Sequence, residues 1–88
     1  MTSVSIAMAT YNGQQYIERQ LDSLAAQTHI PAELVVTDDR SDDDTVAVVK
    51  VFAKNAPFPV KLFTNEIRLG YRKNFMRAAS FERRQRRL

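Results

Sequence analysis

The sequence predicts an α/β domain of the Rossmann-like kind, in which a parallel sheet lies between two layers of helices. Three short apolar runs, at residues 4–9, 34–37 and 60–64, have the length and composition of buried strands. Each run is followed by a segment with apolar residues at helical spacing. This alternation favours parallel strands joined by right-handed crossovers, so we expect a three-layer β-α-β-α-β-α unit with the spatial strand order 3-2-1.

The first strand is predicted over residues 4–9, which are apolar at nearly every position, as in a strand covered on both faces. Asn12 is a candidate cap for the helix that follows, with Gln15 reaching back as in a capping box. The buried positions of that helix follow at helical spacing: Ile17, Leu21, Leu24 and Ala25. We therefore expect an amphipathic helix packed on the sheet.

The second strand ends in two adjacent carboxylates, Asp38 and Asp39. Ser41 and the acidic residues 42–44 then predict a cap and an acidic first helical turn, each carboxylate being favoured by the helix dipole by roughly 0.3–1 kcal/mol. The buried stripe of this second helix is expected to comprise Val46, Val49 and Ala53, broadened by Val48, Val51 and Phe52. Two prolines, at positions 57 and 59, end the helix.

The third strand is predicted over residues 60–64 and the third helix from Tyr71 onward, with Phe75, Ala78 and Ala79 facing inward. In the order 3-2-1 the most apolar strand, residues 4–9, lies at an open edge of the sheet. An apolar edge strand invites pairing with another chain. We therefore expect a further strand on its free side, in a larger domain of which this chain is the first part, or self-association of the chain through that edge.

Composition bounds the function classes. The 88-residue chain has room for one small domain, has no cysteine for a disulfide or thiolate metal site, and shows neither a secretion signal nor a membrane span. Its net charge of +3 is uneven: residues 1–67 carry five basic and nine acidic side chains, and residues 68–88 carry eight and one. Residues 81–88 lack interleaved aromatics, so we expect a disordered or non-native basic tail after a domain of residues 1–80, and a nucleic-acid partner is disfavoured.

Polar side chains gather where the three strands are predicted to end, and ligands bind at that edge of open α/β sheets. They are Thr10, Tyr11 and Asn12, the pair Asp38 and Asp39, and the loop from residue 65 to Arg72. Tyr11 could stack on a heterocyclic base while Asp39 accepts its N–H, whereas the alternative is that the Asp pair only caps and turns the chain. Arg72 and Lys73 could meet a diphosphate, or they could be solvated surface charges.

Other chemistry finds less support. Asp42 and Asp44 have the spacing of a cation-binding D-x-D, but their place in a first helical turn favours capping. His29 stands alone in a loop, without a second ligand or a nucleophile at a useful spacing. With only two glycines, the chain has neither the P-loop nor the dinucleotide-binding glycine pattern. Nicotinamide chemistry and P-loop phosphate transfer are therefore disfavoured.

In combination, these segments resemble the N-terminal half of a family 2 glycosyltransferase. The likeness rests on VSIAMATYN at residues 4–12, YI at 16–17, LDSLAAQT at 21–28 and ELVVTDDRSDDDT at 33–45. LGYRKNF at residues 69–75 is similar to the bacterial branch that builds rhamnose-containing and other surface polysaccharides. The resemblance covers the chain from about Val4 to Ser80.

The resemblance implies a GT-A fold and an inverting hexosyltransferase that moves a sugar from a nucleoside diphosphate to an acceptor hydroxyl of a glycan or lipid-linked glycan. It implies nucleotide-binding roles for the following residues: Thr10, Tyr11, Asn12, Asp38, Asp39, Gly70, Arg72 and Lys73. Such enzymes use a divalent metal, Mg or Mn, held by carboxylates on a fourth strand, and an acidic general base further on. Those metal ligands and that base are not in this chain, so no catalytic residue is assigned and we expect the isolated chain to be inactive.

The sequence departs from the family pattern at two places. Arg40 stands where glycine is common, so the turn after Asp39 could differ in backbone conformation. After Ser80 an Arg-rich ending replaces the Gly-Asp pair and fourth strand of the family. An alternative of another class therefore stays open: a non-enzymatic α/β interaction module whose basic tail docks on an anionic partner. For the enzyme, a cytoplasmic site is expected, in solution or at the inner face of the membrane.

Overall fold

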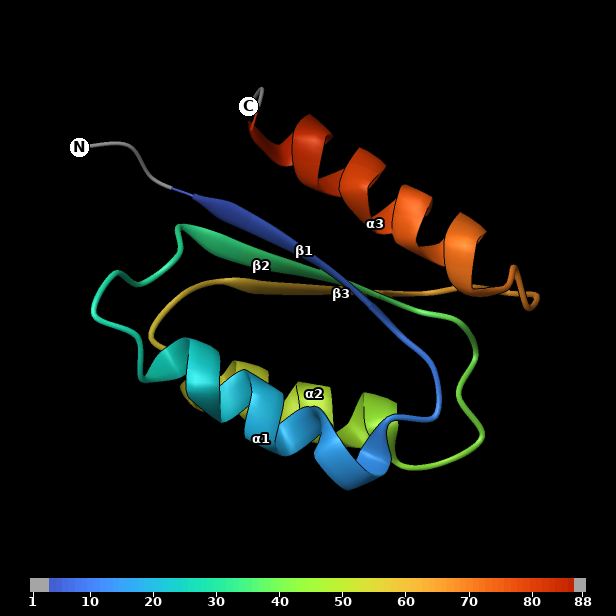
Figure 1. The fold of residues 1–88 in the computed structure, drawn as a ribbon, viewed down its shortest axis with the longest axis horizontal. Coiled ribbons are helices and arrows are strands. Elements are labelled where there is room, and N and C mark those ends of the chain that lie inside the picture. Colours follow the sequence, from blue (N-terminus) through green and yellow to red (C-terminus); the bar gives the residue numbers. More distant parts are fainter. Residues whose placement is uncertain (1–3, 87–88) are drawn as a thin grey trace.

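The computed structural model describes the backbone of residues 4–86 and the side chains of residues 4–81. The elements alternate as predicted: β1 (Ser5–Thr10), α1 (Gln14–Ala25), β2 (Glu33–Asp38), α2 (Thr45–Asn55), β3 (Val60–Thr64) and α3 (Tyr71–Arg86). Helices α1 and α2 cover one face of the sheet and α3 covers the other (Figure 1). The three-layer α/β prediction is therefore confirmed.

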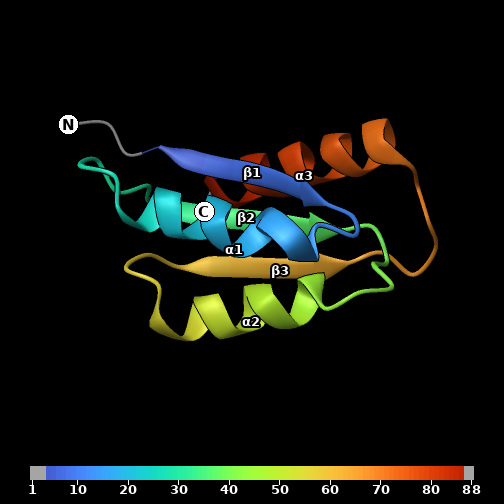
Figure 2. The same ribbon diagram turned by 60° about the horizontal axis from the view of Figure 1, so that its bottom comes forward.

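The three strands are parallel and β2 lies in the centre, in the order β1-β2-β3. This is the predicted order 3-2-1 seen from the opposite edge of the sheet. Their carboxyl ends point the same way (Figure 2). The register pairs Thr10 with Asp38 and Asp38 with Thr64, so the residues that follow each strand emerge side by side at one edge.

Side chains of β2 alternate between the two faces of the sheet, as the pleat of a strand requires. Leu34 and Val36 belong to the core under α1 and α2, whereas the Thr37 hydroxyl donates a hydrogen bond to a backbone carbonyl of α3. The fully enclosed apolar core on the α1 and α2 side consists of Ile17, Leu21, Leu34, Val36, Val49 and Phe58. The same alternation sends Asp38, which ends the strand, and Asp39, which follows it, to opposite faces.

Helices α1 and α2 begin later than the capping signals indicated. Residue Gly13 precedes α1 without a side-chain cap, and Asn12 instead adopts a left-handed conformation with φ 48°. Helix α2 begins at Thr45 after Asp44, so Ser41 and Asp42 lie in the preceding loop. The predicted caps Asn12 and Ser41 were wrong because each side chain binds the neighbouring loop instead. In the predicted acidic stretch, Asp43 accepts a hydrogen bond from the backbone N–H of Thr45, with which α2 begins.

The buried faces of the later helices also differ from expectation. In α2, Val49 is fully buried but Val51 is 63% exposed, so the predicted broad stripe is narrower. In α3, Phe75 is 47% exposed, whereas Asn74 and Ala78 are buried one turn apart. The helix is therefore rotated by about one residue from its predicted orientation, because Asn74 finds polar partners beneath it.

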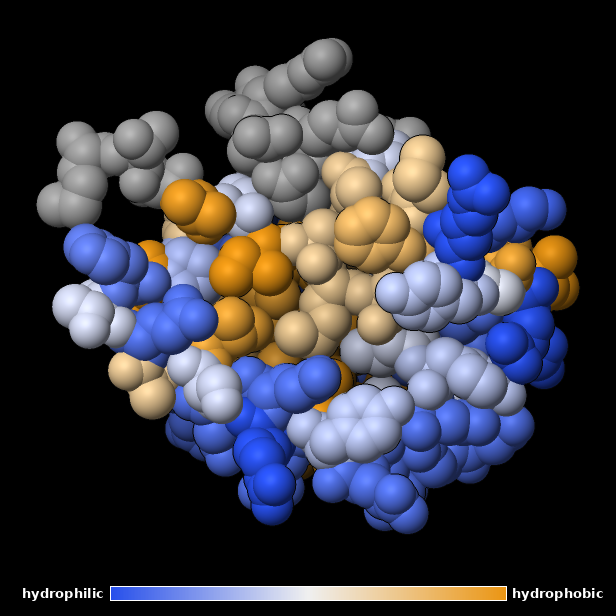
Figure 3. Space-filling view, viewed as in Figure 1, coloured by the Kyte–Doolittle hydropathy of each residue, from blue (hydrophilic) through white to orange (hydrophobic). Residues whose placement is uncertain are grey.

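Strand β1 forms an edge of the sheet, and within residues 4–86 no strand pairs with its other side. Figure 3 shows an apolar area over this strand, between α3 and α1. Ile6 and Met8 are half-buried there, and Val4 is 61% exposed. The sequence prediction of an apolar edge strand is thus confirmed, whereas the further strand and the self-association expected from it stay predictions.

Helix α3 continues past the expected domain boundary at Ser80 to Arg86. Phe81 stacks on Phe63 of β3, with ring centroids 4.3 Å apart, and so ties this part of the helix to the sheet. The structure thus differs from the expected tail for residues 81–86, whereas residues 87–88 lie outside the described residues. Among the described helices, none is long and apolar enough to cross a membrane.

Candidate functional site at the strand ends

The candidate site is the rim formed by the residues after β1 and β2 and by the loop of residues 65–70 after β3. Backbone hydrogen bonds extend the sheet to this rim, from Asp39 N–H to the Thr10 carbonyl and from Asn65 N–H to the Asp38 carbonyl, both at 2.9 Å. The three predicted segments therefore meet at one place. The rest of the site is built on the two carboxylates that β2 delivers.

Asp38 is enclosed on the α1 and α2 side of the sheet. Its carboxylate accepts hydrogen bonds from the Thr10 hydroxyl at 2.7 Å and from the Ser41 hydroxyl and backbone N–H at 2.6 and 2.8 Å. With no exposed surface, Asp38 holds the ends of β1 and β2 together. Thr10 is likewise buried, and its hydroxyl group donates its hydrogen bond to Asp38.

Asp39 lies on the α3 side and is only 1% exposed. Its carboxylate accepts hydrogen bonds from four donors. One carboxylate oxygen accepts from the Leu69 N–H at 2.7 Å and from the Asn65 side-chain amide at 2.9 Å. The other oxygen accepts from the Gly70 N–H at 2.8 Å and from Arg68 Nε at 3.2 Å. Asp39 thus organises the whole loop after β3.

These contacts set the proton affinity of Asp39. Burial by itself raises the pKa of the carboxyl group, but the hydrogen bonds from Leu69, Asn65, Gly70 and Arg68 together outweigh burial and lower the pKa to about 2. Asp39 is therefore an anion at neutral pH and serves as an acceptor of hydrogen bonds rather than as an acid. A general-acid role does not fit it.

Arg68 joins Asp39 to Tyr11. Its guanidinium carbon lies 3.6 Å from the centroid of the Tyr11 ring, a cation–π contact, while Nε forms the 3.2 Å ion pair with Asp39. The side chain of Arg68 is 50% exposed, and Tyr11 is 37% exposed. An aromatic ring, a buried carboxylate and a cation therefore form one accessible cluster.

Asn74 fixes the floor of this cluster from the first turns of α3. Its side-chain amide donates to the carbonyls of Thr10 at 3.2 Å and Thr37 at 3.1 Å, and its oxygen accepts from the Asn65 amide at 2.9 Å. Arg77 donates to the Asn65 side-chain oxygen at 2.6 Å. Asn74 is 2% exposed, so a single amide links β1, β2 and the loop after β3.

A second network joins the loops after β1 and β2 on the other side. Asn12 N–H donates to the Ser41 hydroxyl at 2.9 Å, and the Asn12 side-chain oxygen accepts from Asp42 N–H at 2.8 Å. Four further hydrogen bonds have these partners: Gly13 N–H with Thr45 Oγ1, Gln14 N–H with Asp43 Oδ2, Asp44 N–H with Gln14 Oε1, and Thr45 Oγ1 with Asp43 Oδ1. The two loops therefore behave as one unit, with Asn12 inside it.

The turn after Asp39 keeps a left-handed conformation although it has no glycine. Arg40 has φ 61°, a conformation that costs a residue with a Cβ roughly 1–2 kcal/mol. Arg40 also donates to the Glu66 carbonyl at 3.1 Å, which ties this turn to the loop after β3. The sequence departure at this position therefore leaves a turn of the kind that glycine favours.

A pocket of about 210 Å³ opens at the cluster. Its lining residues are Ala9, Thr10, Tyr11, Tyr16, Asp39, Arg68, Tyr71 and Asn74. The structure thus brings together the predicted residues Thr10, Tyr11 and Asp39, with Gly70 joined to them through its N–H. Arg72 and Lys73 are exposed in the first turn of α3 and do not line the pocket.

Three residues of the cluster were missed by the sequence analysis: Asn65, Arg68 and Asn74. The sequence predicts that the loop after β3 reaches the site, but its aperiodic residues give no orientation for Asn65 or Arg68. Asn74 carried a usable signal, since it lies four residues before Ala78 and so shares its helical face. A buried polar residue on an apolar face requires partners, which would have pointed to the strand ends.

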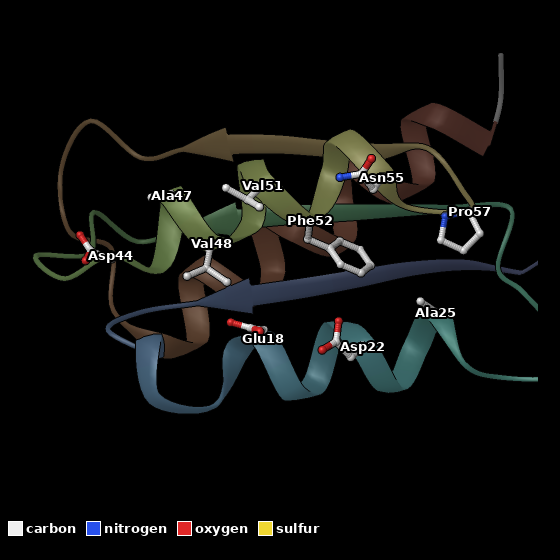
Figure 4. Close-up of a pocket in the computed structure, with 10 residues that line it drawn as sticks. All are labelled: Glu18, Asp22, Ala25, Asp44, Ala47, Val48, Val51, Phe52, Asn55 and Pro57. Carbon is white, nitrogen blue, oxygen red and sulfur yellow. The ribbon is translucent and has the colours of Figure 1, made fainter.

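A larger groove, of about 700 Å³, lies between α1 and α2 and reaches the loops of the rim only at Asp44 (Figure 4). It is lined by Glu18, Asp22, Ala25, Asp44, Ala47, Val48, Val51, Phe52, Asn55 and Pro57. Its acidic side chains stand at the border rather than converging on one point (Figure 4). The groove therefore lacks the polar cluster that distinguishes the smaller pocket.

A metal site is not formed by the part of the chain that the structure describes, where no three His, Cys, Asp or Glu side chains gather. The carboxylates nearest the rim, Asp38 and Asp39, already accept hydrogen bonds at both oxygens. The described residues therefore do not fit the divalent metal that the resemblance implies.

The chain is similar to one known family and to several longer proteins. The profile of Glycosyl transferase family 2 matches residues 5–83. An abequosyltransferase, RfbV of Salmonella typhimurium, is 30% identical over 79 residues, which are 88% of this chain and 24% of that protein. A dTDP-rhamnosyl transferase, RfbG of Shigella flexneri, is 34% identical over 71 residues, 80% of this chain and 25% of that protein.

Two solved structures share the fold at a TM-score of 0.78 each. The mannosyltransferase PcManGT of Pyrobaculum calidifontis, in complex with GDP-Man and Mn²⁺, is 29% identical and is matched over 89% of this chain. TarS 1-349 of S. aureus, in complex with UDP, is 31% identical and is matched over 91% of this chain. In each case the match spans 24% of the solved chain, so the present chain covers about a quarter of its relatives.

Proposed function

Because the chain belongs to Glycosyl transferase family 2, we propose that its rim binds the nucleoside of a nucleoside diphosphate sugar. The single observation that carries this proposal is the cluster of an accessible Tyr11 ring beside the buried anion of Asp39. An aromatic face and a fixed acceptor are the two groups that a heterocyclic base with an N–H requires. Complexes of the two similar structures with GDP-Man and UDP support the same class of ligand.

The proposed roles follow from the positions of the side chains. Tyr11 stacks on the base, Asp39 accepts its N–H, and Thr10 and Asn12 fix the backbone against which the nucleoside rests. Asp38 contributes from the opposite face by holding the ends of β1 and β2 together. Each of these five residues is held by other protein groups before the ligand arrives, which reduces the entropic cost of binding.

The diphosphate is assigned to the beginning of α3. Gly70 lies at φ 90° immediately before the helix and donates its own N–H to Asp39, and the dipole of the helix that follows favours an anion at its first turn. Arg72 and Lys73 are exposed in the first turn and can add charge-assisted hydrogen bonds to phosphate oxygens. The excess of basic over acidic side chains in residues 68–88 supports a diphosphate site at the beginning of this segment.

In the proposed reaction of the whole enzyme, the sugar passes with inversion to an acceptor hydroxyl of a glycan or lipid-linked glycan. The described residues supply neither a general base nor a metal site, so we propose that this chain binds nucleotide but does not transfer sugar by itself. We expect the sugar transfer to take place in the cytoplasm, in solution or at the inner face of the membrane. We propose that the acceptor binds outside this rim.

Calorimetric titration of the 88-residue chain with UDP, dTDP and GDP tests the proposal. We expect at least one nucleotide to bind, and we expect Tyr11→Ala to weaken that binding about 5- to 100-fold, the usual worth of a base–aromatic stack. Asp39→Ala should abolish the binding, with Asp22→Ala on the exposed face of α1 as the matched control. Affinity retained by both rim variants would remove the assignment.

A further inference from the structure

The structure places a side chain of the protein itself where the nucleobase is expected. We propose that Arg68 is an internal competitor of the base, and that nucleotide binds only after its guanidinium has left Tyr11 and Asp39. This inference rests on the proposed function and adds to it a residue that sets affinity. It follows from three observations: the filled acceptors of Asp39, the covered face of Tyr11 and the small size of the pocket.

The first observation is that Asp39 has no acceptor position to spare. A carboxylate offers about four lone-pair sites, and all four donors found here use them. Two donors are backbone N–H groups, of Leu69 and Gly70, and a third is the amide of the buried Asn65. Arg68 is the donor with the longest contact and a half-exposed side chain, so it is the one that can leave without unfolding the loop.

The second observation is that the guanidinium lies over the ring of Tyr11. A planar cation at 3.6 Å from the ring centroid occupies the layer in which a stacked base would lie. A nucleobase therefore cannot stack on this face of Tyr11 while the guanidinium of Arg68 covers it. Arg68 therefore presents to Tyr11 a flat group and to Asp39 an N–H, which are the two features that a base would present.

The third observation is the size of the pocket, about 210 Å³, which is below the roughly 300–1,000 Å³ of ordinary ligand sites. Arg68 forms one of its walls. The neighbouring Glu66 and Ile67 are exposed, so the half-exposed side chain of Arg68 has room to turn outward while the loop backbone stays bonded to Asp39. Departure of the guanidinium would both enlarge the pocket and free one acceptor and one aromatic face.

The energetic consequence is that the measured affinity is reduced by the fraction of molecules in which Arg68 is closed. A bound base would make contacts with Tyr11 and Asp39 in place of those of the guanidinium. The free energy of binding therefore contains only the difference between the two sets of contacts. A cation–π contact and an ion pair at a half-exposed site together favour the closed form about 10-fold. Removal of the guanidinium should therefore tighten nucleotide binding, the opposite of what is expected for a residue that binds the ligand.

The test uses the full 88-residue chain as wild type, Arg68→Gln and the matched control Arg19→Gln, which lies exposed on α1. Calorimetry with UDP, dTDP and GDP should show binding about 3- to 10-fold tighter for Arg68→Gln and unchanged for Arg19→Gln. In the NMR spectrum of the free wild type, the Nε–H signal of Arg68 should be displaced by the Tyr11 ring. Nucleotide should return that signal to the position of a solvated arginine.

Two results would overturn the competitor role: weaker binding by Arg68→Gln, which would make Arg68 a ligand of the nucleotide, or an Nε–H signal that saturating nucleotide leaves in place. If neither wild type nor Arg68→Gln binds any of the three nucleotides, the proposed function fails and the competitor role fails with it. Binding by Arg68→Gln alone would support both. Unchanged backbone spectra of the variants establish that they fold.

Discussion

Replacement of Asp39 by asparagine is the most direct test of how the rim is held together. The amide keeps the shape of the carboxylate but turns one acceptor oxygen into a donor, which then faces two of the four present donors. Backbone N–H groups of Leu69 and Gly70 stand on different oxygens, so either orientation of the amide opposes one of them. The variant therefore leaves a buried N–H group without a partner whichever way it turns.

The expected cost follows from these contacts. Each hydrogen bond to a charged group contributes roughly 1.5–3 kcal/mol, but Arg68 is half exposed and can turn to water when its partner is lost. We therefore expect Asp39→Asn to lower the free energy of unfolding by about 2–4 kcal/mol at pH 7. For a small domain this is a large part of a total of about 5–15 kcal/mol.

The pH dependence provides a second measure. The pKa of Asp39 in the folded chain is lowered to about 2 from 3.8, so the unfolded state binds the proton more tightly. The resulting stabilisation is complete above pH 3.8 and is lost as the pH falls through the interval from about 4 to 2. Allowing for solvent at the rim, it amounts to about 1–2 kcal/mol. The acid loss attributable to this carboxylate should be missing from Asp39→Asn.

Urea unfolding followed by circular dichroism at pH 7, 4 and 2.5 measures both effects. Asp22→Asn removes one exposed carboxylate from α1 and controls for the change in net charge. Asp43, whose pKa is lowered by its hydrogen bond from the Thr45 hydroxyl, titrates in both proteins and so cancels from the comparison. A variant within 0.5 kcal/mol of wild type at pH 7, or one with the same acid loss, would refute this account of the rim.

Two further substitutions test the supports of the site. Asn74→Ala removes three hydrogen bonds at a 2% exposed position, so we expect urea unfolding to show a free energy of unfolding lower by about 2–3 kcal/mol. The exposed Lys73→Ala is the control and should lose less than about 0.5 kcal/mol. Equal losses would show that the amide is dispensable. Gly70→Ala meets open space but must adopt φ 90°, so thermal unfolding should reveal a loss of about 1 kcal/mol from backbone strain, and an unchanged unfolding midpoint would contradict this reasoning.

The fold was predictable because each element repeats a local pattern. Residues 4–9, 34–37 and 60–64 are short apolar runs between helical periodicities, and alternation of this kind leaves few topologies. The rim followed from the same reasoning, since parallel strands end at one edge. That Asp39 and Tyr11 share a pocket could therefore be expected from order alone, whereas their role in nucleotide binding stays a prediction.

The interior of the rim was not predictable, for a physical reason. Residues 65–70 have no periodicity, and their path is fixed by a carboxylate some 30 positions away in the sequence. Asn12 and Ser41 were expected to cap helices because they do so locally in many chains, but here each finds its partner in the neighbouring loop. Phe75 was expected inside on hydrophobicity, although Asn74 is the residue with three buried partners.

The amide of Asn74 has a consequence for how the molecule acquires its function. It bonds the Thr10 carbonyl, a partner 64 positions earlier, and so closes the longest hydrogen-bonded loop described here. The rim is therefore complete only when α3 has docked on the sheet, because Asn74 joins the ends of β1 and β2. A nucleotide bound at the rim would stabilise only those molecules whose last helix is in place.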